Sequence, residues 1–284
     1  MIAMGVGMKI HRVSAFSYEN KGGNPAGVVV SDVMPSDGDM LRIAKDVGYS
    51  ETAFLQPYDG GWRVRYFAPE MEVPFCGHAT IAAGYVLGEL HGQGQYVFFL
   101  NDGSIDVSVE HIEHRGSFVS LNSPATFSEP APAEYVERVL TIMGLSREAL
   151  NPLFPVRFAS AGAKHMILVL QDRETLASLQ YDFESLKSVM SEESLVTINI
   201  LTMASRQKFH SRNPFPPGGV YEDPATGAAA AAFAGYLRDI AWDGDKHLEV
   251  MQGENMGQPS RLLVSYESEV GSSINVSGEA RVID

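Results

Sequence analysis

The chain contains two similar stretches of sequence, PFCGHATIAAGYVL at residues 74–87 and EDPATGAAAAAFAGYL at residues 222–237. In each, a polar loop runs into small apolar side chains, with no charge from Ala79 to Gly88 or from Ala228 to Leu237. A helix that is apolar on every face must be buried, in a core or at the wall of a cleft. The first N–H groups of a helix are unpaired and carry the positive end of its dipole, so each start is a candidate anion site. We therefore expect two similar lobes that together bind one small anionic molecule.

The composition narrows the class of protein. With 284 residues, 45% of them hydrophobic and 20% charged, the chain suits one large domain or two of ordinary size. Its apolar stretches are broken well short of the length of a transmembrane helix, and its first residues carry no signal-peptide pattern. The net charge of −14 argues against nucleic acid and anionic membranes as partners. We expect a cytoplasmic protein that attracts an anionic ligand only locally, through helix starts and a few Arg.

Cysteine and histidine usage limits the possible metal chemistry. Cys76 is the only cysteine, so an intramolecular disulfide and a zinc site built from several cysteines are both excluded. This usage fits a reducing compartment. Apart from His78, the histidines are scattered without the spacing of metal ligands. We therefore expect no metal site.

The pattern along the chain predicts an α+β fold. Each half offers many strands and one central apolar helix, which a sheet curled around it would bury best. We expect an N-terminal lobe at residues 1–123, completed by residues 270–284, and a C-terminal lobe at residues 124–269. The predicted linker between the lobes runs from Asn122 to Ala133, where three prolines stand among small residues.

Local signals predict where individual elements begin. The sequence at Met8 has the form of an ordinary start, which leaves Met1 and Met8 both open as the first residue. Ser36 is expected to cap a helix over residues 37–47, because acidic residues follow it in the first turn. Gly48 is the predicted stop of that helix.

Glu51 is the first candidate for proton chemistry. It lies just after a predicted helix stop and opens an apolar strand that contains Phe54. Partial desolvation disfavours the charged form of a carboxyl group, which suits a group that both takes up and returns a proton. The alternative is a solvated Glu at a turn. Glu70 and Glu72 are rivals on the same grounds, and Glu72 is expected to be structural.

Polar residues near the two helix starts are further candidates. His78 lies in the first turn of the first helix, where the dipole disfavours imidazolium; a neutral imidazole that contacts a ligand and a satisfied core histidine are both open. At the second start, Asp223 and Thr226 are candidates for substrate contact, and either could simply cap the helix. Arg212 precedes a Pro- and Gly-rich loop. It could reach a substrate carboxylate, or be a solvated Arg beside a turn.

Cys76 also lies at a helix start, where a thiol ionises more easily, so a nucleophile pair with His78 is conceivable. The two residues are two positions apart and need not face one another, and no third orienting group is evident. We therefore do not favour a thiol hydrolase.

Short motifs follow one another along the chain in a specific order. They are GNPA at 23–26, SETAF at 50–54, FAP at 67–69, FCGHAT at 75–80, EDPATG at 222–227, QG at 252–253 and MGQPS at 256–260. Together they resemble the PhzF-like isomerase family of phenazine biosynthesis, within the diaminopimelate-epimerase fold superfamily. The resemblance covers nearly the whole chain, and its most specific parts are SET, CGHAT and EDPATG in this order.

The resemblance implies two pseudo-symmetric lobes, each a mixed, barrel-like sheet around a central helix, with the site in the cleft where the helix starts meet. It also implies a homodimer, no metal or organic cofactor, and a reaction that moves a proton along a conjugated ring, as in a dihydro-hydroxyanthranilate. By position, Glu51 matches the residue that takes the proton and returns it, while His78 and Asp223 match groups that bind and orient the substrate. The remaining matched substrate-binding positions are Asn24, Cys76, Gly77, Thr226, Gly227 and Ala228.

Two departures bear on the reaction. Many relatives have Ser after the Thr-Gly pair, whereas this chain has Ala228, so one hydroxyl is missing and the substrate stays open. The other branch of the superfamily epimerises amino acids with two thiols, but here Thr226 stands where the second thiol would be, and its hydroxyl is too weak an acid and base. The alternatives that remain are an epimerase or dehydratase that uses Cys76, and a catalytically silent protein that only binds a metabolite.

Overall fold

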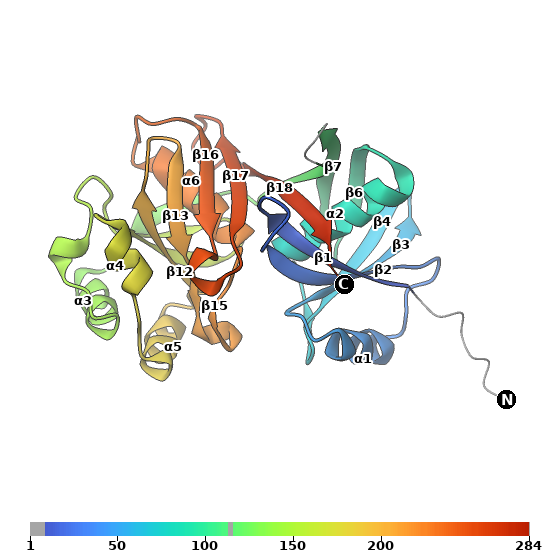
Figure 1. Cartoon of the computed structure of the whole chain (residues 1–284), viewed down its shortest axis with the longest axis horizontal. Coiled ribbons are helices and arrows are strands. Elements are labelled where there is room, and N and C mark those ends of the chain that lie inside the picture. Colours follow the sequence, from blue (N-terminus) through green and yellow to red (C-terminus); the bar gives the residue numbers. More distant parts are fainter. Residues whose placement is uncertain (1–8, 113–115, 284) are drawn as a thin grey trace. The chain divides into compact units, whose positions relative to one another are not determined.

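The computed structural model describes residues 9–112 and 116–283 (Figure 1). The question of whether Met1 or Met8 begins the chain falls on residues outside these ranges. The chain divides into two compact units. Unit 1 extends to Asn122 and includes the last residues from Ser277 onward, and unit 2 extends from Ser123 to Val276.

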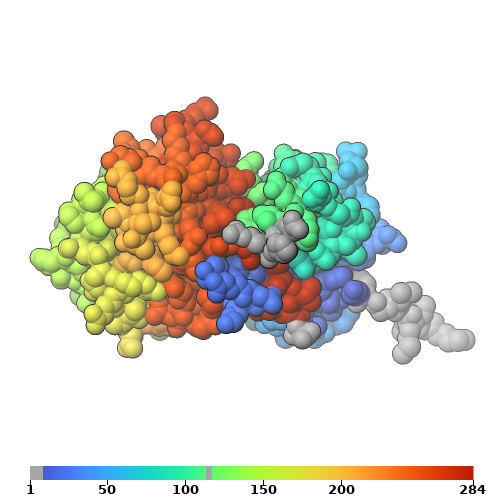
Figure 2. All heavy atoms as spheres, turned by 45° about the horizontal axis from the view of Figure 1, so that its top comes forward, coloured from blue at the N-terminus to red at the C-terminus, as the bar shows by residue number. Residues whose placement is uncertain are grey.

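Unit 1 holds one mixed sheet and two helices. Its helices are α1 (Asp37–Val47) and α2 (Gly77–His91). Its strands are β1 (Ile10–Ser17), β2 (Asn24–Val30), β3 (Thr52–Tyr58), β4 (Gly61–Phe67), β5 (Glu72–Val73), β6 (Gly94–Phe99), β7 (Ser104–Ile112) and β8 (Gly116–Asn122). They pair in the order β1-β2-β3-β4-β6-β7-β8, and β5 pairs with β4. The end of β18 (Ile274–Val282) pairs with β1 through Val13 and Val282, which brings the two ends of the described chain together (Figure 2).

Unit 2 has the helices α3 (Ala133–Ile142), α4 (Arg173–Ser178), α5 (Phe183–Glu192) and α6 (Gly227–Asp239). Its main strands are β9 (Phe127–Pro130), β10 (Arg157–Ser160), β11 (Lys164–Leu170), β12 (Thr197–Met203), β13 (Lys208–Arg212), β16 (His247–Gln252) and β17 (Ser260–Tyr266). They pair in this order. The short strands β14 (Pro214–Phe215) and β15 (Val220–Glu222) form a separate pair. The prediction of a mixed fold of helix and sheet is thus confirmed.

The two units repeat one order of strand pairing. In unit 1, β1 and β2 pair antiparallel, and β2 and β3, between which α1 lies in the chain, pair in parallel. β3 and β4 then pair antiparallel, and β4 and β6, between which α2 lies in the chain, pair in parallel. In unit 2, β10 and β11 pair antiparallel, and β11 and β12, between which α4 and α5 lie in the chain, pair in parallel. β12 and β13 then pair antiparallel, and β13 and β16, between which α6 lies in the chain, pair in parallel. The two similar stretches of sequence therefore occupy the same place in two similar units.

Both stretches form buried helices, as predicted. α2 packs against β1, β2, β3, β7 and β8, and α6 packs against β9, β10, β11, β12 and β17. Small residues make this contact close: a Cβ atom on Gly84 would lie 2.6 Å from Val119 Cγ1 and 2.8 Å from Val107 Cγ1. In unit 2, a Cβ atom on Gly235 would lie 2.8 Å from Thr126 Cβ. The glycines thus set how near each helix lies to its sheet.

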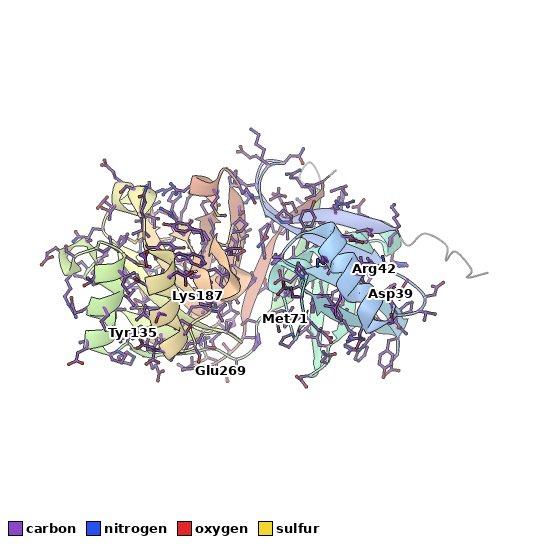
Figure 3. The ribbon with its side chains drawn as sticks, turned by 90° about the horizontal axis from the view of Figure 1, so that it is seen from below. Asp39, Arg42, Met71, Tyr135, Lys187 and Glu269 are labelled. Carbon is purple, nitrogen blue, oxygen red and sulfur yellow. The ribbon has the colours of Figure 1, made fainter. Side chains whose placement is uncertain are left out.

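Other helices add a second apolar layer to each sheet. The Ser36 side chain caps α1 by accepting from the Asp39 N–H, and Gly48 ends the helix with φ of 74°, as predicted. Asp39 and Arg42 lie on the exposed face of α1 (Figure 3), while its apolar face packs in a cluster with Phe54. In unit 2, α3, α4 and α5 enclose a larger cluster against β10, β11 and β12.

The linker prediction is wrong for much of its length. Phe127–Pro130 forms β9, the edge strand of unit 2, because it pairs with β10. Thr126 is buried, accepts a hydrogen bond from Arg238 Nη2 at 2.5 Å and donates to the Ser272 carbonyl at 2.9 Å. Pro130, the one proline within β9, ends this edge strand, and a proline there is compatible with sheet. Throughout the described ranges, no helix combines the length and the apolarity needed to cross a membrane.

We expect Gly84→Val to lower the free energy of unfolding by about 1–3 kcal/mol, because the added methyl groups would overpack α2 against Val107 and Val119. Urea denaturation followed by circular dichroism measures this change. Gly38→Val is the matched control, since a Cβ atom on Gly38 of α1 meets nothing within 4 Å. Equal losses in the two variants would contradict the close packing of α2.

Candidate active site

The two central helices begin without a capping side chain. Side chains of Ser36, Asp172 and Asp182 accept first-turn N–H groups of α1, α4 and α5. At α2 and α6 the N-cap residues are Cys76 and Thr226, and no such hydrogen bond is present among the described residues. Because no side chain at the N-cap accepts from these first turns, their N–H groups are suited to an anionic ligand.

The buried hydroxyl groups of Tyr66 and Thr80 hold the first turn of α2 in place. Thr80 Oγ1 donates to the Cys76 carbonyl at 2.8 Å, and the Thr80 N–H donates to the same oxygen at 2.9 Å. Tyr66 Oη lies 2.6 Å from Thr80 Oγ1. Since the single Thr80 hydroxyl proton is used on Cys76, Tyr66 is the donor to Thr80. This chain of bonds fixes the residue that begins the helix.

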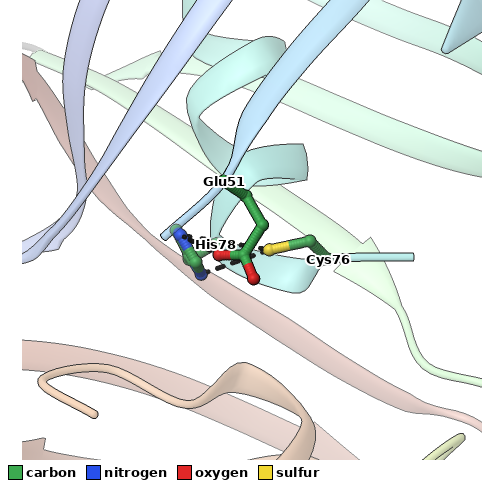
Figure 4. A group of neighbouring side chains, drawn as sticks. All are labelled: Glu51, Cys76 and His78. Atoms are coloured by element: carbon green, nitrogen blue, oxygen red, sulfur yellow. Dashed lines mark hydrogen bonds and ion pairs between the residues drawn. The ribbon is translucent and has the colours of Figure 1, made fainter. Parts of the chain in front are cut away.

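Glu51, Cys76 and His78 form one cluster at the start of α2 (Figure 4). His78 Nε2 lies 3.3 Å from Glu51 Oε2, and His78 Nδ1 lies 3.3 Å from Cys76 Sγ. Ser50 Oγ is 3.4 Å from His78 Nε2. Cys76 and His78 are two positions apart, so the sequence did not predict that their side chains face one another, yet the first turn of α2 brings them into contact. Glu51 is the third group beside this pair, which was not evident from the sequence.

The Glu51 carboxylate is poorly solvated and incompletely bonded. Its side chain is 20% exposed, and Oε2 is buried with no hydrogen bond from the described residues, because its 3.3 Å approach to His78 lacks hydrogen-bond geometry. Its rivals differ: Glu70 is exposed. Glu72 is structural as predicted, since hydrogen bonds from Arg65 at 2.8 and 2.6 Å hold its pKa below the usual range. Glu51 is therefore partly buried, unlike its rival Glu70.

Asn24 lies at the same end of the sheet as Glu51. It begins β2 and is buried, and the N–H of Gly27, three residues later, donates to the Glu51 carbonyl at 3.2 Å. β2 and β3 are parallel, with Gly27 paired to Thr52, so the residues before these strands lie side by side. The structure thus brings Asn24 toward the segment that carries Glu51.

At the start of α6, Asp223 and Thr226 are bonded to each other. Thr226 Oγ1 donates to Asp223 Oδ2 at 2.5 Å. Thr226 is the N-cap residue of α6, but its side chain makes no capping hydrogen bond, so the interpretation of Thr226 as a side-chain cap is wrong. Gly227 is buried at the first helical position, and Ala228 beside it is partly exposed. These four residues form the polar start that the sequence predicted.

Gln252 holds this start and was missed as a functional residue. Its amide nitrogen donates to the Asp223 carbonyl at 2.6 Å and to Thr226 Oγ1 at 2.9 Å, and its Oε1 accepts the Thr226 N–H at 3.1 Å. It is 1% exposed at the end of β16. In the sequence, this role was signalled by the position of Gln252 in the motif QG at residues 252–253. The next residue, Gly253, has φ of 74° and comes too close to the Pro224 carbonyl for a side chain.

Arg212 supports this region and is buried, so both interpretations of it as a substrate contact and as a solvated Arg are wrong. Its guanidinium bonds to the carboxylate of Glu222, and Nη1 donates to the carbonyls of Leu176 and Leu179, each at 2.9 Å. The side chains of Arg212 and Glu222 are 8% and 4% exposed. Because Glu222 precedes Asp223, the pair fixes the strand that leads into α6.

A buried polar network lies behind α6. His165 Nδ1 is 2.8 Å from Thr197 Oγ1, which donates to Asn213 Oδ1 at 2.9 Å, and the Asn213 carbonyl accepts the Asp223 N–H at 3.1 Å. Asn199 Nδ2 donates to the Ala229 carbonyl in the first turn of the helix at 3.1 Å. The position of Asp223 thus depends on residues of β11 and β12 and on Asn213, which lies between β13 and β14.

Comparison with known proteins gives matches over the whole length. A family model described as phenazine biosynthesis-like protein, PhzC-PhzF, matches residues 13–284. An uncharacterized isomerase of Mesorhizobium japonicum is 31% identical over 281 residues, which cover 93% of each chain. The trans-2,3-dihydro-3-hydroxyanthranilate isomerase of Pseudomonas aeruginosa is 29% identical over 277 residues, which cover 94% of each chain.

Solved structures share the fold. A PhzF-family phenazine biosynthesis protein of Bacillus anthracis has a TM-score of 0.84 at 24% identity, over 98% of this chain and 97% of that chain. A hydroxyproline epimerase from Agrobacterium vitis has a TM-score of 0.65 at 12% identity, over 98% of this chain and 91% of that chain. At these identities the likeness concerns the fold alone.

We expect Arg212→Met to lower the free energy of unfolding by about 3–5 kcal/mol, because it leaves the buried Glu222 carboxylate without a partner. Chemical denaturation measures the loss. Arg138→Met is the matched control, since Arg138 and its partner Glu192 are exposed, and little change is expected there. A fully stable Arg212→Met variant would contradict the structural role of Arg212.

Burial makes His165 a source of acid sensitivity. Desolvation lowers the pKa of His165 to about 3, whereas the unfolded chain titrates near its ordinary value of about 6.5. Between these values the unfolded state binds more protons, so the free energy of unfolding falls as pH falls below about 6.5. We expect His165→Asn to reduce this slope by up to about 1.4 kcal/mol per pH unit.

Denaturation midpoints measured between pH 5 and 7 test this expectation. His247→Asn is the control, because the His247 side chain is 84% exposed and has no such burial to lose. An unchanged slope in His165→Asn would show that His165 does not stay neutral in the folded state.

Proposed function

The chain belongs to the PhzC-PhzF family of phenazine biosynthesis-like proteins, and from this premise we propose that it is an isomerase that needs no cofactor and moves a proton within a small carboxylic acid, through Glu51. The single observation that carries the proposal is the Glu51 oxygen that is buried without a hydrogen-bond donor beside an uncapped helix start. A carboxylate oxygen without a hydrogen-bond donor is free to accept a proton from a bound substrate. The family's curated relatives that are named isomerases support the reaction class.

The proposed reaction conserves atoms and electrons. The Glu51 carboxylate takes a proton from a C–H group of the substrate, and the electron pair of that bond moves into the adjacent conjugated system, toward the substrate carboxylate. The protonated Glu51 then returns the proton to another carbon of that system, and a double bond is left in a new position. One general acid-base group is sufficient, because the same carboxyl group takes up a proton and returns one, and its proton can exchange with solvent between the two steps.

In this proposal the neighbours of Glu51 bind and orient. His78 lies 3.3 Å from the carboxylate and donates or accepts a hydrogen bond at the substrate's polar groups. N–H groups of the first turn of α2, beginning at Gly77, stabilise the negative charge that develops as the proton leaves. Asn24 and Cys76 line the same helix start.

We also propose that the start of α6 binds a small anionic substrate group. Asp223 would orient it, and Thr226, Gly227 and Ala228 would contact it. Each sheet would curl around its central helix, which is supported by the contacts of α2 with strands from both ends of the order in unit 1. A homodimer, a cytoplasmic location and the absence of nucleic-acid and membrane partners remain proposals of the same kind. A small cyclic or amino carboxylic acid suits an uncapped helix start, because its carboxylate accepts hydrogen bonds from the first N–H groups.

One observation favours a second candidate. Cys76 Sγ lies 3.3 Å from His78 Nδ1, and the other imidazole nitrogen faces Glu51. A thiol beside a base that a third group orients is the usual arrangement of an activated nucleophile or thiol base. An epimerase or dehydratase that uses Cys76 is therefore the alternative, and a protein that only binds a metabolite is the second.

We expect Glu51→Gln to keep ligand affinity and to lose turnover by at least about a hundredfold, because the amide cannot take up the proton. A thermal-shift screen of small cyclic and amino carboxylic acids identifies a ligand. NMR in D2O then follows deuterium incorporation into that ligand. Equal incorporation by the wild type and by Glu51→Gln would refute the role of Glu51.

We expect Cys76→Ala to retain turnover within about tenfold, since the thiol takes no part in the proposed proton transfer. The same NMR assay measures it. Complete loss in Cys76→Ala, with Glu51→Gln still active, would favour the thiol reaction. Binding without exchange in every variant and in the wild type would favour the metabolite-binding protein.

A further inference from the structure

The Gln252 amide makes three hydrogen bonds, and two of them go to the backbone. Its Oε1 accepts the Thr226 N–H at 3.1 Å, and its Nε2 donates to the Asp223 carbonyl at 2.6 Å. These two bonds hold the chain ahead of α6, as a purely structural glutamine would. The third bond runs from Nε2 to the Thr226 hydroxyl oxygen at 2.9 Å. It reaches a side chain that itself contacts the Asp223 carboxylate, so it bears on the candidate site.

The backbone fixes which way the Gln252 amide faces. A backbone N–H can only donate and a carbonyl can only accept, so Oε1 must face the Thr226 N–H and Nε2 must face the Asp223 carbonyl. The opposite orientation would set donor against donor and acceptor against acceptor. Burial restrains the amide further, because Gln252 is 1% exposed and its strand is paired to β13 through Ser211 and to β17 through Ser260. Nε2 is therefore the atom that faces the Thr226 hydroxyl.

This orientation decides where the Thr226 hydroxyl proton goes. Because Nε2 donates to Oγ1, the hydroxyl oxygen is the acceptor in that bond, and its own single proton is used elsewhere. Asp223 Oδ2, which lies 2.5 Å away, accepts this proton. The separation matches a hydrogen bond from a hydroxyl to an ionised carboxylate, for which about 2.5–2.7 Å is usual, and such bonds are stronger than those between neutral groups. The amide thus directs the hydroxyl, and the hydroxyl holds the carboxylate.

We propose that Gln252 is a positioning residue for the reaction, which directs the Thr226 hydroxyl proton to Asp223 and so holds the Asp223 carboxylate in one orientation for a bound substrate. The inference rests on the proposed function, in which Asp223 orients the substrate. The backbone of Asp223 is fixed at the same time, because its N–H donates to the Asn213 carbonyl at 3.1 Å. Such precision matters for turnover, since a displacement of about 1 Å in a substrate-positioning group can lower the rate by about a hundredfold.

Gln252→Glu is the most direct test, because it keeps the shape of the side chain and removes the donor. The new carboxylate can only accept, so it competes with Asp223 for the Thr226 hydroxyl proton. Thr226→Val removes this proton, and Thr226→Ser keeps it. We expect kcat to fall by at least about tenfold in Gln252→Glu and in Thr226→Val, with KM changed by less than about threefold, while Thr226→Ser stays near the wild type. Deuterium incorporation into the carboxylic acid that the thermal-shift screen identifies measures both constants.

A double variant separates this role from a structural one. If Gln252 acts through the Thr226 hydroxyl, then adding Gln252→Glu to Thr226→Val should lower kcat by less than about twofold more. A glutamine that only supports the backbone would lower kcat alike with and without that hydroxyl. Gln252→Met removes the donor without adding a charge, and its effect should depend on the Thr226 hydroxyl in the same way.

The orientation of Asp223 can also be measured without substrate. Three-bond NMR couplings to the Asp223 carboxyl carbon, in protein with isotope-labelled aspartate, report its χ1 angle. They should indicate one rotamer in the wild type and in Thr226→Ser, and averaging over rotamers in Gln252→Glu and in Thr226→Val. Gln56→Glu is the matched control, since Gln56 Oε1 of unit 1 likewise accepts a backbone N–H, that of Met34, at 2.8 Å. Both the couplings and kcat should keep their wild-type values in this control.

A single Asp223 rotamer together with full turnover in Gln252→Glu or in Thr226→Val would overturn the proposal. Equal losses of kcat from Gln252→Glu with and without the Thr226 hydroxyl would also overturn it, because Gln252 would then act on the backbone alone. Loss of the single rotamer in both variants of a chain that isomerises nothing would leave the positioning of Asp223 standing and reject the proposed function.

Discussion

Close packing of an apolar helix on its own sheet is the constraint on which the candidate site depends. α2 can lie near β7 and β8 only because Gly84 and Gly88 present no side chain to the valines of these strands. α2 is buried from its first turn to Leu87, which restrains that turn, and no side chain at the N-cap caps it. Its first N–H groups are therefore held in position for a ligand. The same holds for α6, where Gly235 packs on Thr126.

The two helix starts share a similar backbone arrangement but carry different side chains. At α2, the residues around the start are a thiol, an imidazole and a carboxylate. At α6, they are Asp223, Thr226 and Gln252, which are hydrogen-bonded to one another. Relatives with the same fold include a hydroxyproline epimerase, so the fold alone does not select the reaction.

Sequence reasoning reached the family, the mixed fold and the two buried helices, because ordered motifs and an uncharged apolar run are local signals. It placed Glu51, His78 and Cys76 as separate candidates. It misjudged Arg212, because nothing near that residue in the sequence shows that Glu222 and three backbone carbonyls will enclose it. It also took the segment of β9 for a linker, since prolines at 124, 130 and 132 lie within and around it, and a proline such as Pro130 is equally typical of an edge strand. Such errors concern partners far apart in the chain.

The sequence by itself determined the composition of each helix start, since helix dipole, small residues and turn residues act within a few positions of one another. Only the tertiary structure decided which side chains meet there. Glu51 joins Cys76 and His78 because the segment before β3 ends beside the first turn of α2. Gln252 reaches Asp223 and Thr226 because β16 pairs in parallel with β13 across α6. The physical reason is that burial and hydrogen bonding depend on proximity in space, which strand pairing creates between residues that the sequence keeps apart.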